Sequence, residues 1–271
     1  MMKIFSLLVC AFGLLAQHGP VNPGKIVARQ WPGYGELHFP VASKSPESAT
    51  WANQGMRLVY AFNHPEAAAS FRKATDLDAD CSLCWWGLSY SLGNNINMPL
   101  MPENAGAAYN SVQKALTTAK SPREKAYAAA LSQRYDKENP ADRSKLDKAF
   151  AMAMKNVAQA FPDDLNAQVI YADSLMNLTP WKLFDREGKP NTYSEEIIAV
   201  LESVMNADPL HLGANHLYIH AVEASKTPER ALQSSLRLAR LAPGSGHLVH
   251  MPAHIFMRTG DYEMAAQVNA T

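Results

Sequence analysis

The stretch WANQGMRLVYAFNHPEAAASFRKA, residues 51–74, decides the fold of this protein. Its apolar residues follow a helical period on both sides of Asn63, His64 and Pro65, which predicts two helices joined by a tight turn. Gly55 lies in the first helix and Ala67 lies twelve residues later in the second. Because small side chains allow two helix backbones to approach closely, these positions predict an antiparallel helix pair.

The same spacing returns further along the chain. Ala231 follows Ile219 by twelve residues, and Ala265 follows Ala253 by twelve, with the turn sequence RTGDY between them. Ile219 and Ala253 are 34 residues apart. A period of 34 residues is that of the tetratricopeptide repeat (TPR), whose helix pairs stack on one another. We therefore predict an all-α fold, a right-handed superhelical TPR solenoid of about six helix-turn-helix units.

The repeat grid also sets the predicted organisation of residues 46–271. The units are expected at about 46–79, 80–120, 121–162, 163–209, 210–243 and 244–271. Insertions at 93–104 and 179–194 separate the helices of the second and fourth units, and insertions in solenoids often contribute to binding. The sequence stops inside the expected second helix of the last unit, with no polar capping helix, so we expect a solenoid truncated at the C-terminus.

The N-terminus predicts export. Lys3 precedes an apolar run from Ile4 to Ala16, which is too short to span a bilayer and is typical of a signal peptide over residues 1–16. We expect a periplasmic or secreted protein with no transmembrane segment in the mature chain. Residues 17–45 are rich in glycine and proline and predict an irregular leader.

Composition argues against a nucleic-acid partner. The chain has 25 lysine and arginine residues against 25 aspartate and glutamate residues, and it has no long run of one sign. A nucleic-acid-binding protein usually presents a basic face. The apolar content of 47% is that of a globular protein with a sizeable core.

In a TPR solenoid the first helix of each pair lines the concave surface, and four positions of that helix form one stripe toward the groove. We expect this groove stripe to consist of Ala49, Ala52, Met56 and Val59; Cys81, Cys84, Leu88 and Ser91; Asn166, Val169, Asp173 and Met176; Gly213, His216, His220 and Glu223; and His247, His250, His254 and Met257. Five of the nine histidines therefore fall on groove positions of two neighbouring helices.

These histidines predict a metal site. His216 and His220 are four residues apart on one helix face, as are His250 and His254, and this is a spacing that zinc-binding helices use. Neighbouring helices pack about 8–10 Å apart, so their imidazoles can share an ion, with His247 as a further ligand.

Imidazole ligands suit zinc, copper or iron, and Met251 and Met257 near the cluster favour copper. Asp173 and Glu223 are candidates for carboxylate ligands, for groups that orient the imidazoles, or for a general base.

Three functions remain open at this point. The first is a binding scaffold whose groove holds a protein or peptide partner, with the metal as a structural or regulatory element. The second is a metal-dependent enzyme, hydrolytic or oxidative, in which histidines hold the ion and leave a position for water or substrate. The third is a metal-free groove in which polar histidines bind a peptide or a small ligand.

Cys81 and Cys84 begin the first helix of the second unit. A structural disulfide, a redox dithiol at a helix N-terminus and a pair of reduced packing residues are all compatible with this spacing. Trp85 stands where haem attachment would require a histidine, so that use is excluded.

The chain resembles a group of exported bacterial TPR proteins from about Gly35 onward. The resemblance is carried by GELHFPV, FNHPEAAASFRKA, CSLCWWG, NNINMP, ANHLYIHAVEAS, PERAL and GHLVHMPAHI followed by GDY. It implies the repeat fold, export and a longer protein, and it implies no particular reaction.

Overall fold

The computed structural model describes residues 26–270, and the prediction of an all-α fold is confirmed for them. Within this range there is no β-strand, only isolated bridges between Asn95 and Met98 and between Phe184 and Pro190. The helices are α1 (Pro46–Tyr60), α2 (His64–Leu77), α3 (Ser82–Ser91), α4 (Pro102–Thr118), α5 (Pro122–Ser132), α6 (Ser144–Ala160), α7 (Leu165–Met176), α8 (Ser194–Ala207), α9 (Leu212–Val222), the 3-10 turn η2 (Pro228–Ala231), α10 (Leu232–Leu241), α11 (Gly246–His250), α12 (Pro252–Thr259) and α13 (Tyr262–Asn269).

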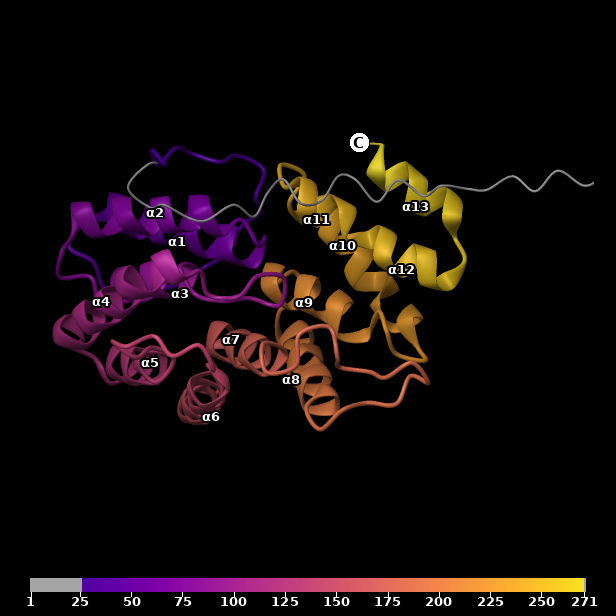
Figure 1. Ribbon diagram of the computed structural model, residues 1–271. Helices are drawn as coiled ribbons and strands as arrows, with labels where there is room; N and C mark the ends of the chain where they lie inside the picture. The colour runs from indigo at the N-terminus through magenta and orange to yellow at the C-terminus, as the bar shows by residue number, and fades with distance from the viewer. Residues whose placement is uncertain (1–25, 271) are drawn as a thin grey trace, which may run out of the picture.

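The helices form a stack of helix-turn-helix units. Helices that follow one another in the chain pack together, from α1 on α2 through to α12 on α13. Figure 1 shows the units winding from the indigo end to the yellow end of the molecule. The stack curls far enough for α1 to pack against α9, which brings the first unit beside the fifth.

Local sequence signals fix where the helices begin and end. The Ser121 side chain accepts from the backbone N–H of Glu124, and the Glu124 carboxylate accepts from that of Ser121, which is a capping box at the start of α5. Ser45 caps α1 in front of Pro46, and Gly260 ends α12 at a φ of 85°. Proline is common at the first position of a helix and glycine is common just after the last, so these residues mark the helix ends.

The packing of Phe71 explains why Gly55 and Gly87 carry no side chain. This ring of α2 is fully buried between α1 and α3, where it faces Gly55 on one side and Gly87 on the other. A Cβ on Gly55 would lie 2.7 Å from the Phe71 ring, and one on Gly87 would lie 2.1 Å from it. Because these positions lack side chains, one aromatic ring locks three helices together.

The first helix of the sixth unit is broken at Met251. Pro252 has no backbone N–H, so the helical hydrogen bond at that position is missing and α11 ends where α12 begins. The break separates His247 and His250 on α11 from His254 on α12. The two helices therefore need not share one axis, and their histidines can point in different directions.

Residues 26–45 run as an irregular strap over the concave side of the stack. Phe39 of the strap is fully buried against Trp86 of α3 and Tyr127 of α5. The carbonyl oxygen of His38 accepts from Asn166 of α7 at 3.0 Å. The backbone of Gly33 reaches the turn between α10 and α11. The segment that we predicted as a leader thus occupies part of the concave surface.

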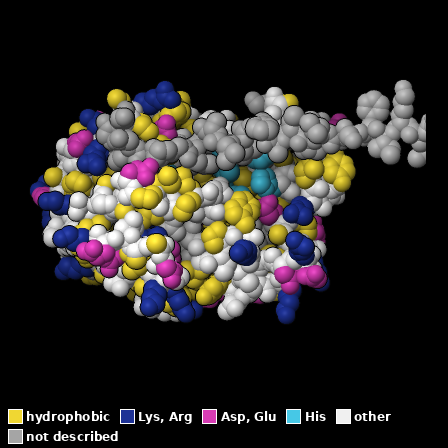
Figure 2. Space-filling model, in the orientation of Figure 1, with side chains coloured by type: hydrophobic (Ala, Val, Ile, Leu, Met, Phe, Trp, Pro, Cys, Tyr) yellow, Lys and Arg dark blue, Asp and Glu magenta, His cyan; other side chains and the backbone are white. Residues whose placement is uncertain are grey.

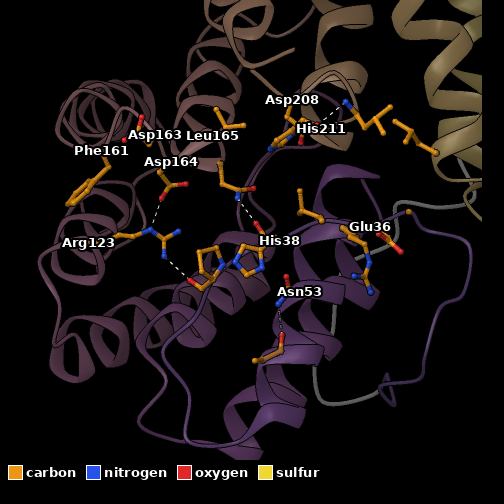
Figure 3. A pocket seen from close by; sticks show the side chains of 18 of the residues that line it. Glu36, His38, Asn53, Arg123, Phe161, Asp163, Asp164, Leu165, Asp208 and His211 are labelled. Carbon is orange, nitrogen blue, oxygen red and sulfur yellow. Dashed lines mark hydrogen bonds and ion pairs between the residues drawn. The ribbon is translucent and has the colours of Figure 1, made fainter. Parts of the chain in front are cut away.

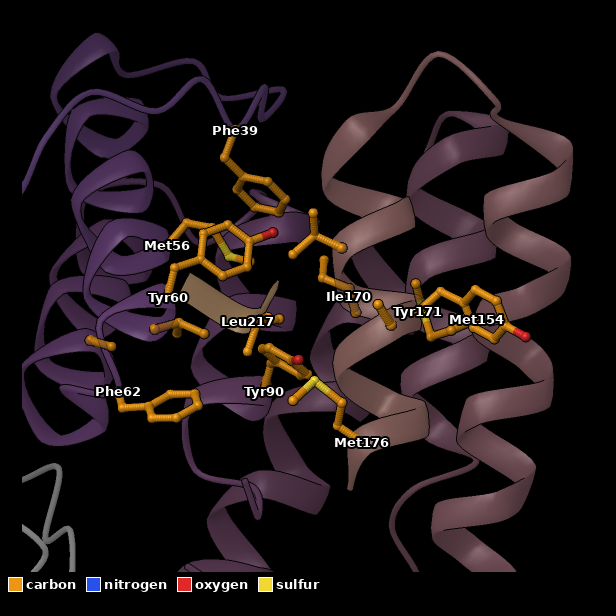
Figure 4. Packing of buried hydrophobic residues seen from close by; sticks show 14 of the residues in the cluster. Phe39, Met56, Tyr60, Phe62, Tyr90, Met154, Ile170, Tyr171, Met176 and Leu217 are labelled. Carbon is orange, nitrogen blue, oxygen red and sulfur yellow. The ribbon is translucent and has the colours of Figure 1, made fainter. Parts of the chain in front are cut away.

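The groove stripe is mostly buried, contrary to our expectation of an open surface. Ala52, Met56, Leu88 and Val169 have no exposed surface. Figure 4 shows side chains of the strap, α1, α3, α7 and α9 meeting in this interior. The reason is the tight curl, because first helices that face one another across a narrow superhelix pack together and exclude water.

Residues 1–25 lie outside the described part of the chain, and the signal peptide predicted over residues 1–16 lies entirely among them. Among residues 26–270 no helix combines the length and the apolar character that crossing a bilayer requires.

Candidate metal centre

The five stripe histidines meet at the contact between α9 and the α11–α12 segment. The ring centres of His216 and His247 lie 4.9 Å apart, and those of His220 and His254 lie 5.6 Å apart. His216 and His220 are buried, whereas His247, His250 and His254 are partly exposed. On the face drawn in Figure 2, histidine side chains gather at one place on the surface.

Four of the rings are held by hydrogen bonds at Nδ1. The partner of His216 is the carbonyl oxygen of Tyr60, at 2.6 Å. His220 and His254 meet the two carboxylate oxygens of Glu223, at 2.9 and 2.6 Å respectively. His250 meets the Asn269 side-chain oxygen at 2.6 Å. Carbonyl, carboxylate and amide oxygens only accept, so each Nδ1 carries the hydrogen.

The orientation of the Asn269 amide is fixed independently. Its Nδ2 donates to the carbonyl oxygen of Ala265 at 2.8 Å, so its oxygen is the atom that faces His250. A neutral imidazole with its hydrogen on Nδ1 presents a lone pair at Nε2. The lone pair on Nε2 is therefore the one available to a metal ion in His216, His220, His250 and His254. This is the usual arrangement around a protein-bound metal.

Glu223 is the residue that orients two of these rings. Burial alone would raise the pKa of Glu223, but the hydrogen bonds from His220 and His254 outweigh it and bring the pKa down to about 2. The side chain is therefore a carboxylate at neutral pH. With one ring on each oxygen, it serves as an imidazole-orienting group more readily than as a general base.

The buried histidines are held neutral. Burial lowers the pKa of His216 well below its ordinary value, and the neighbouring His247 and His220 lower it further. Burial also lowers the pKa of His220, although Glu223 acts in the opposite direction. Neutral imidazole is the form that binds a metal.

Two groups of side chains in the described structure have the proximity that a metal requires. They are His216, His220 and His247, and His220, Glu223 and His254, and in each group the potential ligand atoms lie within 4.8 Å of one another. The Nε2 atoms of His216 and His247 are 3.0 Å apart. Two nitrogens bound to one ion at about 2.0–2.1 Å stand roughly 3.4 Å apart in a tetrahedral site. The observed separation needs only a small adjustment.

His220 adds an unpartnered nitrogen lone pair to the first group. Its Nε2 is buried, and among the described residues it has no hydrogen-bond partner. A buried nitrogen without a partner costs about 1–3 kcal/mol, and a metal ion or a water molecule bound there would offset that cost.

Aromatic side chains enclose the first group. The Phe62 ring lies 4.5 Å from His216, 5.8 Å from His220 and 5.4 Å from His247, measured between ring centres. Phe62 has a φ of 55°, a strained conformation for a bulky residue, in the turn between α1 and α2. Trp181 of the second insertion places its ring edge-on to His220 at 5.3 Å.

Each end of the cluster opens into a cavity. One of about 190 Å³ is lined by His220 and Glu223 together with apolar side chains that include Ile96, Trp181 and Leu183. Another, of about 320 Å³, is lined by residues of the sixth unit and by Glu223; they are His250, Ala253, His254, Met257, Arg258 and Asn269.

Asp173 does not join the histidines. This buried carboxylate accepts hydrogen bonds from Tyr90 and from Asn177, and it belongs to neither potential metal group. Burial raises the pKa of Asp173, against the hydrogen bond of Tyr90 and the charge of Arg134. The geometry gives no support to Asp173 as a ligand or as a base at this centre.

Cys81 and Cys84 form a disulfide at the start of α3. Both cysteines are fully buried, and neither belongs to a potential metal group. Exchange with an external thiol requires access to sulfur, so burial favours the structural role over the redox role.

An open part of the concave side remains as a cleft of about 1340 Å³ (Figure 3). The strap and the starts of α7 and α9 line it, with charges of both signs that include Arg57, Arg123, Asp163 and Asp208. His211 also lines it; burial lowers the pKa of His211 to about 4. This cleft is where a small ligand or peptide has room, and it lies apart from the five stripe histidines.

Sequence reasoning missed four contributors to the centre. Phe62 and the Tyr60 carbonyl come from the first unit, and no local pattern relates them to α9. Asn269 lies 19 residues after His250, in α13. Trp181 lies in an insertion that we had marked as a binding loop, so its position could have been anticipated.

Comparison with known proteins adds little to this description. No protein-family model matches the chain, and no curated protein matches it. Among solved structures, one titled "MamA RS-1 ArsTM double mutant" is similar with a TM-score of 0.36 and 12% identity, over 83% of this chain and 91% of that one. A likeness of this degree bears on neither ligand nor reaction.

Proposed function

We propose that this protein binds a transition-metal ion through His216, His220 and His247. The observation that carries the proposal is that potential ligand nitrogens of these three imidazoles lie within 4.8 Å of one another, while the Tyr60 carbonyl and Glu223 fix His216 and His220 at Nδ1. An ion there would bind the lone pair of His216 and the buried Nε2 of His220, which has no hydrogen-bond partner among the described residues. Three neutral nitrogen ligands suit zinc, copper or iron.

The bound ion would join two units of the helical scaffold. His216 and His220 belong to α9, while His247 belongs to α11, so one ion cross-links the fifth unit to the sixth. It would also hold Phe62 in place from the first unit. Metal binding is then linked to stability, since an ion that binds only the folded chain stabilises it by RT ln(1 + [L]/Kd).

The metal proposal is tested by elemental analysis of protein purified from cells supplied with zinc, copper and iron. We expect at least one metal ion per chain in the wild type and one ion fewer in the double variant His216→Ala/His247→Ala. His38→Ala, at an exposed histidine of the strap, is the matched control and should keep the metal. A wild type without metal after supply of all three ions would overturn the proposal.

A metal-dependent enzyme is the second candidate, and the cavity of about 190 Å³ favours it. This cavity joins apolar walls to His220, so a small apolar molecule would fit beside an ion that three histidines leave partly open. Both oxygens of Glu223 already bind imidazoles, so a metal-bound water is a better nucleophile or base than Glu223. Trp181→Ala would widen the cavity and should alter turnover without removing the metal.

We also propose that the protein is exported. The pattern of residues 1–16 and the disulfide between Cys81 and Cys84 support this, because disulfides persist in oxidising compartments. The test is the N-terminal sequence of protein recovered from periplasm and medium. Cleavage after Ala16 supports export, and an intact Met1 in cytosolic protein contradicts it.

A further inference from the structure

We propose that the histidines form two metal positions, and that His250 and His254 hold a second ion next to the first. This inference rests on the proposed function and adds a site to it. The first position consists of His216, His220 and His247, and the second of His250 and His254. Glu223 lies between the positions and orients one ring of each.

The divergence of the rings at Glu223 separates the two positions. His220 and His254 both donate from Nδ1 to this carboxylate, one to each oxygen. The two nitrogens of an imidazole point in different directions from the ring, so both Nε2 atoms turn away from Glu223. The Nε2 of His254 meets that of His250 at 3.1 Å, whereas the Nε2 of His216 meets that of His247 at 3.0 Å.

The pair formed by His250 and His254 requires a cation between its nitrogens. Asn269 and Glu223 hold the hydrogen of each ring on Nδ1, so both Nε2 atoms carry lone pairs. Two lone pairs aimed at each other across 3.1 Å repel unless a positive charge lies between them. Either a proton or a metal ion supplies that charge. Because the pocket beside the pair accommodates an ion with further ligands, we assign a metal.

The further ligands at the second position come from a wet pocket. The cavity of about 320 Å³ next to His250 and His254 admits water, and Met257 lines it with 55% of its surface exposed. A thioether beside two imidazoles is a ligand set that favours copper over zinc. We therefore expect the second position to prefer copper and to exchange its ion more readily than the first, whose ligands from α9 are buried.

The experiment is a metal titration of the full chain after removal of bound ions by a chelator. Cuprous ion is delivered from a chromophoric competitor, and the number of ions bound per chain is counted. We expect two for the wild type, one for His250→Ala/His254→Ala, and one for His216→Ala/His247→Ala. The control His38→Ala should still bind two.

Conservative single changes guard against misfolding. His250→Gln keeps size and polarity at a partly exposed position and should also reduce the count from two to one, with an unchanged circular dichroism spectrum. Anomalous X-ray scattering from copper-loaded crystals should show two peaks beside Glu223.

The outcomes separate the two proposals. One ion in the wild type that survives in His250→Ala/His254→Ala overturns the second position and leaves the first intact, and a proton then lies between His250 and His254. If the wild type binds no cuprous ion, the second position is overturned, and the first fails as well if zinc and iron do not bind either.

Discussion

Gly244 donates its backbone N–H to the carbonyl oxygen of Gly33 at 2.8 Å, and this bond fastens the N-terminal strap to the turn between α10 and α11. Gly33 has a φ of 77°, and a Cβ there would lie 2.9 Å from the nitrogen of Gly244. A glycine is therefore required by both conformation and space. The contact holds the first residues of the described chain to the unit that carries His247.

Gly33→Ala should destabilise the protein by about 1–2 kcal/mol from the left-handed conformation alone, with more from the clash. Urea denaturation measures the change. Gly106→Ala is the matched control, because a Cβ at this position in α4 meets nothing within 4 Å. Alanine there should stabilise by up to about 1 kcal/mol. Equal effects of the two substitutions would contradict the role assigned to the strap.

Glu223→Gln should weaken metal binding by roughly 10–100-fold, because it removes the charge that orients His220 and His254. Competition titration against a chelator measures the affinity. Glu202→Gln serves as control, since Glu202 bonds Tyr218 of α9 and Arg230 but touches none of the five histidines in the described contacts. An affinity that is unchanged in Glu223→Gln would remove Glu223 from the centre.

Phe62→Ala should destabilise the metal-free protein by about 3–5 kcal/mol, because the buried ring packs against His216, His220 and His247. Phe62→Gly should be no worse, and we expect it to be better by up to about 1 kcal/mol. Glycine relieves the positive φ of 55° by about 1–2 kcal/mol, at an entropic cost of about 0.5–1 kcal/mol. Chemical denaturation measures the stability of both variants. A glycine variant clearly less stable than the alanine variant would show that the turn is unstrained.

Cys81→Ala/Cys84→Ala should lower stability by about 2 kcal/mol, the loop-closure contribution expected for so short a loop. Metal content should not change, because the cysteines belong to neither metal group. Thermal unfolding and elemental analysis of the same sample test both statements. Loss of metal without loss of stability would mean that the pair acts on the centre.

Asp78 should make stability depend on pH in the acid range. It accepts hydrogen bonds from the Ser43 hydroxyl at 2.7 Å and from the Lys44 N–H at 2.7 Å. Burial acts to raise the pKa of Asp78. The two hydrogen bonds, together with one from the backbone N–H of Asp80, outweigh the effect of burial and lower the pKa. Since the folded pKa is below the unfolded value of about 3.9, the stabilisation is complete above that pH and is lost as pH falls through the folded pKa.

Asp78→Asn should therefore cost about 1–2 kcal/mol at pH 7, and the difference from the wild type should shrink below about pH 3. Denaturant titrations at several pH values measure it. Asp76→Asn, at a nearby exposed position, should leave the profile unchanged. A constant difference between wild type and Asp78→Asn down to pH 2 would refute the assignment.

Much of the local organisation was readable in the sequence. The twelve-residue spacing of Gly55 and Ala67 predicted the close packing of α1 on α2, and Asn63, His64 and Pro65 predicted the turn between them. These signals act within one or two helices, so their spacing along the chain reflects their spacing in space. The histidine spacings likewise placed His216 and His220 on one face of α9, toward the sixth unit.

The curl of the stack was not readable, because it sums small rotations between units that no single motif encodes. This curl buried Met56 and Leu88, where we had expected an open groove, and let the strap insert Phe39. It also placed Asp173 beside Tyr90, away from the histidines, and it brought Phe62 of the first unit into contact with them.

The sequence by itself determined the helices, the repeat and the residues able to bind a metal, since periodicity and side-chain chemistry are local properties. Only the tertiary structure decided which partner holds each imidazole. His254 and His220 share Glu223, His250 depends on Asn269, and His216 depends on the Tyr60 carbonyl. Each of these bonds fixes which imidazole nitrogen carries a hydrogen, and it does so through a contact whose direction only the folded chain sets.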